Sequence, residues 1–182
     1  DILGLAERAG RKVEVAAAIT TAKAMGGGVF LLTLTFPHGL GDDLGQITAL
    51  FLKAYAKLWT GKAGMKLREK LGLHGTIRAI EVTHGANGFH PHVHVLLFLD
   101  PHTRLEADCG ASITPEEAHA LIAPRWQKVA LSCGLPAPSL ERGCHVDGGD
   151  KAAAYVAKGS TWGLEKEMTK GQVKVAKGAK GR

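Results

Sequence analysis

The chain has 182 residues, enough for one folded domain with short appendages, and 45% of them are hydrophobic, which suffices for a buried core. Lysine and arginine outnumber aspartate and glutamate by 23 to 17, and the net charge of +6 favours a polyanionic partner such as nucleic acid. No stretch approaches the ~20 apolar residues that a membrane-spanning helix needs, and no secretion signal opens the chain.

The first part of the chain predicts a helix, a strand and two further helices. Residues 2–24 are alanine-rich and precede three glycines, which is typical of a helix and its end. Residues 29–36 are mostly β-branched or aromatic, and they predict a buried strand that Pro37 stops. Apolar residues at helical spacing predict a helix over 47–59, and a short basic helix is expected over 62–71.

The middle of the chain predicts a β-hairpin followed by a helix. Two strands are expected over 76–83 and 90–99, joined by the Gly-Ala-Asn-Gly sequence of residues 85–88. Thr114 stands before Pro-Glu-Glu, a pattern typical of a helix cap, and the helix should run to residue 133.

The order of these elements predicts the fold class. A short strand over 144–146 and a helix over 150–158 complete a series of strand, helix, hairpin, helix and strand. We therefore expect an α+β fold, with a central antiparallel sheet and helices packed on one face, in the manner of ferredoxin-like or RRM-like domains. The expected divisions are an N-terminal helix over 1–25, the domain proper over 26–165, and a basic, partly mobile segment over 166–182.

The cysteines indicate a reducing compartment. Cys109, Cys133 and Cys144 are odd in number and lack the spacing of a zinc ribbon. We therefore expect a cytoplasmic protein without disulfides. Because the chain opens within a helix-like stretch and ends at Lys-Gly-Arg, we also expect it to be part of a longer protein.

The hairpin carries a candidate metal site. Side chains alternate along a strand, so His92 and His94 point to the same face. Glu81 lies opposite His92 if residues 85–88 form the loop, and opposite His94 if Asn87 and Gly88 alone form the turn. Either register puts the carboxylate on the histidine face, ~5 Å from the opposed side chain.

Two imidazoles and one carboxylate leave coordination positions open, which is typical of a catalytic site. Mg²⁺ or Mn²⁺ would suit a phosphate substrate, although imidazole also accepts zinc or nickel. His90 shares the parity of the pair and could be a further ligand or a hydrogen-bond donor to one. The alternative is a solvated polar face, but Leu96 and Phe98 continue the same face and favour partial burial of the histidines.

The two tyrosines differ in their surroundings. Tyr55 lies on the apolar face of its predicted helix and should belong to the core. Tyr155 follows three alanines and stands three positions before Lys158, so both should share one helix face. A phenol is a poor nucleophile unless a metal or cation stabilises its phenolate, and Lys158 could do so or could hold a phosphate.

These residues resemble the three motifs of rolling-circle plasmid replication initiators, the single-tyrosine HUH endonucleases, in which U is a hydrophobic residue. The motifs are Leu-Leu-Thr-Leu-Thr at 31–35, the stretch 81–98 with His-Pro-His-Val-His, and Tyr-Val-Ala-Lys at 155–158. The segment 162–171 is also similar to the one that follows the tyrosine in these proteins. The resemblance covers residues 7–171; its histidine and tyrosine motifs together are specific, and its first motif is not.

The resemblance implies an origin-specific, metal-dependent DNA nickase and strand transferase. Glu81, His92 and His94 would hold the metal, Mg²⁺ or Mn²⁺. Tyr155 would attack a phosphodiester to give a 5′-phosphotyrosine intermediate and a free 3′-hydroxyl, and Lys158 would position the phosphate.

The implied partners are single-stranded or hairpin DNA at a plasmid origin, together with a host helicase and polymerase, and no membrane. Candidate contacts with the DNA backbone are Lys151, Lys166, Lys170 and Lys174. Some relatives carry a glutamate four residues before the tyrosine that activates water for a terminating hydrolysis. Here that position is Lys151, and whether Asp150 or Asp147 substitutes is open.

Three other functions are compatible with part of the pattern. A conjugative relaxase shares the metal chemistry, but its tyrosine precedes the histidine motif, whereas Tyr155 follows it. A zinc hydrolase of small molecules would need no Tyr155. A non-catalytic nucleic-acid-binding module would expose aromatic residues on its sheet, and only 5% of this chain is aromatic.

Overall fold

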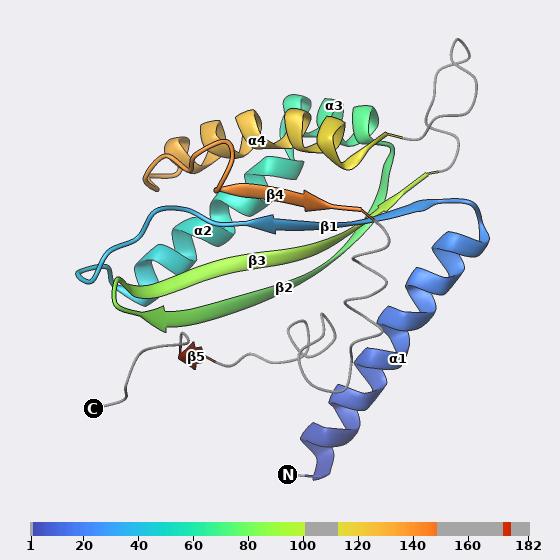
Figure 1. Cartoon of the computed structure of the whole chain (residues 1–182), viewed down its shortest axis with the longest axis horizontal. Helices are drawn as coiled ribbons and strands as arrows, with labels where there is room; N and C mark the ends of the chain where they lie inside the picture. The colour runs from blue at the N-terminus through green and yellow to red at the C-terminus, as the bar shows by residue number, and fades with distance from the viewer. Residues whose placement is uncertain (1, 101–112, 149–172, 176–182) are drawn as a thin grey trace.

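The computed structural model describes residues 2–100, 113–148 and 173–175 (Figure 1). Within them, the elements match the predicted series, and most boundaries differ from the predicted ones by only a few residues. In chain order they are α1 (Ile2–Ala24), β1 (Gly28–Leu34), α2 (Leu44–Trp59), α3 (Gly61–Leu71), β2 (Leu73–Gly85), β3 (Gly88–Leu99), α4 (Pro115–Ser132), β4 (Cys144–Asp147) and β5 (Val173–Val175). The predicted helix over 150–158 lies outside the described residues.

The strands form one sheet in the order β4-β1-β3-β2-β5. The first four are antiparallel to their neighbours, as predicted, and β5 pairs parallel with the end of β2. The central position of β3 places the histidine motif between β1 and β2, so side chains from three strands can surround it (Figure 1).

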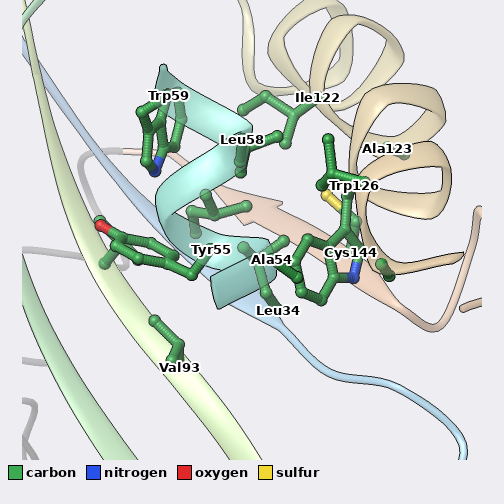
Figure 2. Close-up of a cluster of buried hydrophobic side chains, with 14 of the residues drawn as sticks. Leu34, Ala54, Tyr55, Leu58, Trp59, Val93, Ile122, Ala123, Trp126 and Cys144 are labelled. Carbon is green, nitrogen blue, oxygen red and sulfur yellow. The ribbon is translucent and has the colours of Figure 1, made fainter. Parts of the chain in front are cut away.

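Helices α2 and α4 cover one face of the sheet through a large apolar core. Alternate residues of β1 and β3, including Leu34 and Val93, point into it and meet Phe51 and Trp126, all of them buried. Figure 2 shows the centre of this cluster between α2, α4 and the strands. The predicted α+β fold, with an antiparallel sheet and helices packed against it, is therefore confirmed, but the helices are not confined to one face because α1 lies on the other.

The other face of the sheet is partly covered by α1. Val15 and Ile19 of this helix are buried against Val29, Leu31 and Leu96, which alternate with the residues of the main core. By the same alternation, the even-numbered residues of β3 from His90 to Phe98 lie on the α1 face. The histidine motif is thus on the opposite side of the sheet from α2 and α4.

The start of α4 and the cysteines agree with the sequence. Thr114 caps α4 in a reciprocal capping box with Glu117, as its position predicts. Cys133 and Cys144 are buried and unbonded, and Cys109 lies outside the described residues. Among the described residues, no helix has the length and apolar character needed to cross a bilayer.

Candidate metal centre

The register of the β2–β3 hairpin sets the position of Glu81. Its Cα pairs with that of His92, His84 pairs with Phe89, and the ladder continues to Gly85 and Gly88. This is the register predicted for a four-residue connection, and the alternative, with Glu81 opposite His94, is not observed. Because directly opposed residues share a face, the carboxylate points to the histidine side of the sheet.

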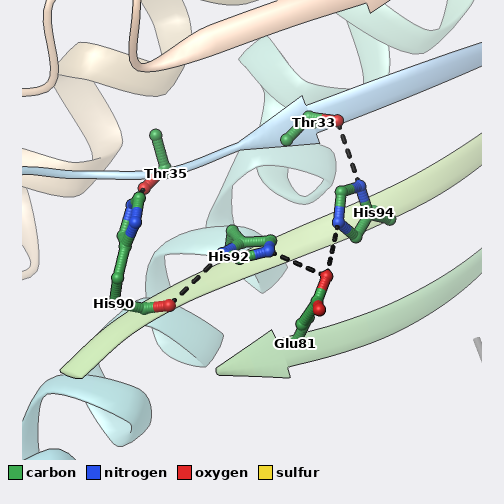
Figure 3. A network of polar contacts seen from close by, with 6 residues as sticks. All are labelled: Thr33, Thr35, Glu81, His90, His92 and His94. Carbon is green, nitrogen blue, oxygen red and sulfur yellow. Dashed lines mark hydrogen bonds and ion pairs between the residues drawn. The ribbon is translucent and has the colours of Figure 1, made fainter. Parts of the chain in front are cut away.

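Glu81, His92 and His94 converge on one point (Figure 3). His92 Nε2 lies 3.0 Å and His94 Nε2 lies 3.3 Å from the same carboxylate oxygen, Glu81 Oε2. One potential ligand atom from each residue lies within 4.8 Å of the others. Glu81 is only 5% exposed and His94 only 8%, so the carboxylate is held with two imidazoles away from bulk water.

The remaining nitrogen of each imidazole has a hydrogen-bonding contact of its own. His94 Nδ1 lies 3.1 Å from the hydroxyl of Thr33, on the neighbouring strand β1. His92 Nδ1 lies 3.2 Å from the carbonyl oxygen of His90. If both Nδ1 atoms donate, each Nε2 presents its lone pair beside the Glu81 carboxylate, where a cation can share it.

This donor set fits a divalent cation. Two imidazoles and one carboxylate are a known ligand set for zinc and non-haem iron, and the carboxylate also suits Mn²⁺. Three protein ligands leave positions for water or a substrate oxygen. The rings are already held from outside by Thr33 and by the backbone, as in established metal centres. The predicted ligands are therefore brought together, and the arrangement is suited to binding an anionic oxygen.

His90 stands apart from this group. Its Nε2 forms a short hydrogen bond with the hydroxyl of Thr35, and its ring stacks on His38 with centroids 4.3 Å apart and 12° between the planes. Burial, followed by the nearby His38 and His92, lowers the pKa of His90 to about 4. His90 does not belong to the group formed by Glu81, His92 and His94, and its carbonyl oxygen contacts the candidate ligand His92.

The sequence did not predict that Thr33, Thr35 and His38 contact the histidine motif. The threonines lie in the Leu-Leu-Thr-Leu-Thr stretch, whose alternation already puts both on one face of β1. The pairing of β1 with β3, which sets Thr33 opposite His94, is a long-range contact that local patterns do not reveal. His38 follows Pro37 in a loop and carried no signal.

Asp147 lies on the same face of the sheet but at its edge. It ends β4, pairs with Leu31, and its Oδ1 lies 3.3 Å from Nε2 of the exposed His145. It does not belong to the group formed by Glu81 and the two histidines. Asp150, the other carboxylate considered for a terminating hydrolysis, lies outside the described residues.

The predicted nucleophile and its neighbours also lie outside the described residues. These are Tyr155, Lys158, Lys151, Lys166 and Lys170; Lys174 belongs to β5, but its side chain is not described. Tyr55 is buried in the main core, as predicted, with the Arg78 guanidinium 5.0 Å from its ring centroid. Burial raises the pKa of the Tyr55 phenol, and the sheet separates it from the histidines.

Comparison with known proteins gives one distant relative. A Streptomyces lividans protein named "Protein rep" is 29% identical over 144 residues, which cover 64% of this chain and 32% of that protein. The chain thus spans about a third of the length of this relative. No protein-family model matches the chain, and no solved structure matches it.

Proposed function

We propose that this chain is the catalytic domain of an initiator of rolling-circle plasmid replication, a metal-dependent nickase and strand transferase acting on single-stranded DNA. The observation that carries the proposal is the convergence of Glu81, His92 and His94 on one sheet face. Two further points support it: the order of the sequence motifs, with the tyrosine after the histidines, and the name of the Streptomyces relative.

Glu81, His92 and His94 would hold Mg²⁺ or Mn²⁺ in this function. The bound ion would act as a Lewis acid on the scissile phosphate, whose developing negative charge it would offset. The protein contributes a carboxylate and two imidazoles already aimed at one point, so little reorganisation accompanies binding. The face opposite α2 and α4 would then be the DNA-binding face.

Tyr155 is the proposed nucleophile. Its phenol oxygen would form a bond to phosphorus as the bond from phosphorus to the 3′ oxygen breaks; the phenol proton is lost and the 3′ oxygen gains one. The products are a 5′-phosphotyrosine and a free 3′-hydroxyl. Because a phosphodiester replaces a phosphodiester, the reverse attack by a 3′-hydroxyl can rejoin strands. Lys158 would neutralise charge on the phosphate.

Chain length is compatible with this role for Tyr155. It follows Asp147, the last residue of β4, by eight positions. Eight residues reach at most ~29 Å when extended. Since only β1 separates β4 from β3, about 10 Å lies between these two strands. A tyrosine on this tether can therefore reach the candidate ligands, whereas the buried Tyr55 cannot.

The proposed partners follow from the chemistry. The substrate is single-stranded or hairpin DNA at a plasmid origin, and Lys151, Lys166 and Lys170 are proposed contacts with its backbone. A helicase and a polymerase of the host would use the opened strand and the free 3′-hydroxyl. All of these are cytoplasmic activities. A terminating hydrolysis would need its own base, for which Asp147 and Asp150 are candidates.

The test is nicking of an origin-bearing single strand in Mn²⁺, followed by a denaturing gel that retains covalent protein–DNA species. We expect a covalent band with the wild-type protein, none after chelation by EDTA, and none with Tyr155→Phe. Tyr55→Phe is the matched control, because it removes the only other phenol from the far side of the sheet, and it should nick normally. Undiminished cleavage by Tyr155→Phe would refute the mechanism.

A further inference from the structure

Thr33 of β1 and Thr35, which follows the end of that strand, contact histidines of β3. Thr33 pairs with His94 in the β1–β3 ladder, and the Thr33 hydroxyl oxygen lies 3.1 Å from His94 Nδ1. Thr35, two residues on and on the same face, contacts His90 Nε2. Figure 3 shows the Thr33 hydroxyl on β1 and the Thr35 hydroxyl just beyond the end of that strand, both directed toward the histidines. One threonine thus touches a candidate metal ligand, and the other touches a histidine outside the ligand group.

A metal-binding imidazole needs a defined tautomer. For Nε2 to offer its lone pair, the proton must be on Nδ1, where it needs an acceptor. His94 is 8% exposed, so water has little access to take that place. The Thr33 hydroxyl oxygen can accept a hydrogen bond from Nδ1–H and still donate its own hydrogen elsewhere, and its position on a paired strand holds the ring at a set angle.

We propose that Thr33 is a positioning residue for His94: its hydroxyl accepts the Nδ1 hydrogen and turns Nε2 toward Glu81. The proposal rests on the metal site of the proposed function and adds the residue that keeps it in a binding-competent state. For His92, the carbonyl oxygen of His90 is the corresponding acceptor beside Nδ1, and no side-chain substitution removes this backbone group. Thr33 is therefore the side chain through which ligand orientation can be altered without touching a ligand.

The structure provides a matched pair for testing this role. Thr33→Val keeps the shape of the side chain and removes the acceptor, whereas Thr33→Ser keeps the hydroxyl. Thr35→Val makes the same change two residues on, just beyond the end of β1, but at a histidine outside the ligand group. A general weakening of β1 would affect both valine variants, whereas loss of ligand orientation would affect only the first.

The experiment is calorimetric titration of each folded protein with Mn²⁺ alone. Mutation of a residue that hydrogen-bonds to a metal ligand typically lowers the affinity for the metal ~10–100-fold. We expect Thr33→Val to raise the dissociation constant at least about tenfold, Thr33→Ser to stay within about threefold of wild type, and Thr35→Val to match wild type. Equal binding by Thr33→Val and wild type would overturn the proposal, as would equal weakening by both valine variants.

A second measurement needs no variant that could fail to fold. Nitrogen NMR of the wild-type protein saturated with zinc, which is diamagnetic, distinguishes the two imidazole tautomers of His94 in the metal-bound state. We expect the proton of His94 on Nδ1; a proton on Nε2 would overturn the proposal. Absence of Mn²⁺ binding by the wild-type protein would instead refute the metal site of the proposed function. Failure of the proposed function is thus distinguishable from failure of the role proposed for Thr33.

Discussion

Glu81 is the residue on which the candidate centre depends most directly, because one of its oxygens faces both imidazoles. Replacing it with glutamine removes the negative charge and should abolish most of the stabilisation by metal. Mn²⁺ at 100 times its dissociation constant should raise the free energy of unfolding of the wild type by about 2.7 kcal/mol. Thermal melts with and without Mn²⁺ measure this. Glu69→Gln, at an exposed position of α3, is the control and should respond like wild type.

His90 should make stability depend on pH in the metal-free protein. Burial first, and then His38 and His92, lower its pKa from 6.5 to about 4. Between these values the unfolded chain binds the proton and the folded protein does not, so the free energy of unfolding should fall as pH decreases from 6.5 to 4. Urea denaturation in EDTA across this range should show a flatter dependence for His90→Gln. Identical slopes for variant and wild type would contradict the assignment.

At the scale of elements, the β2–β3 hairpin keeps Glu81 and the histidines in register. Gly88, the first residue of β3, is needed for the backbone conformation at its turn. Its φ is +88°, and an added Cβ would lie 2.9 Å from the carbonyl oxygen of Gly39. Gly88→Ala should therefore destabilise the protein by about 1–3 kcal/mol. Gly75→Ala, where nothing lies within 4 Å of the added carbon, should change stability far less. Urea denaturation of the two variants tests the difference.

The hairpin also shows what the sequence could predict. Strand alternation has a period of two, so the parity of His92, His94 and Glu81 followed from the turn residues alone. The contacts of Thr33 and His38 did not, because they depend on the pairing of β1 with β3 and on the path of a loop. Likewise, nothing local indicates that β5 pairs with β2. The face on which each strand residue lies could therefore be predicted from local sequence, whereas these contacts between distant segments could not.

At the scale of the whole molecule, the sheet is packed on both faces, and α1 covers the apolar part of the face that carries the histidines. Ile19 is 6% exposed in this contact, so Ile19→Ala should destabilise the protein by about 2–4 kcal/mol. Val13, on the same helix, is 70% exposed, and Val13→Ala should change stability by less than about 0.5 kcal/mol. Thermal melts distinguish a packed α1 from a loosely attached one, for which both variants would be neutral.

The two outer strands of the sheet have a consequence for strand joining. Asp147 ends β4 on the edge of the sheet next to β1, and Val173 begins β5 on the opposite edge next to β2. Tyr155 falls between these points in the sequence and is therefore anchored on both sides. A doubly anchored segment searches a smaller volume than one with a free end, which raises the effective concentration of whatever it carries. If Tyr155 is the nucleophile proposed above, a DNA end bound to it would be tethered to the sheet through both of these strands, and its rejoining would be an intramolecular reaction.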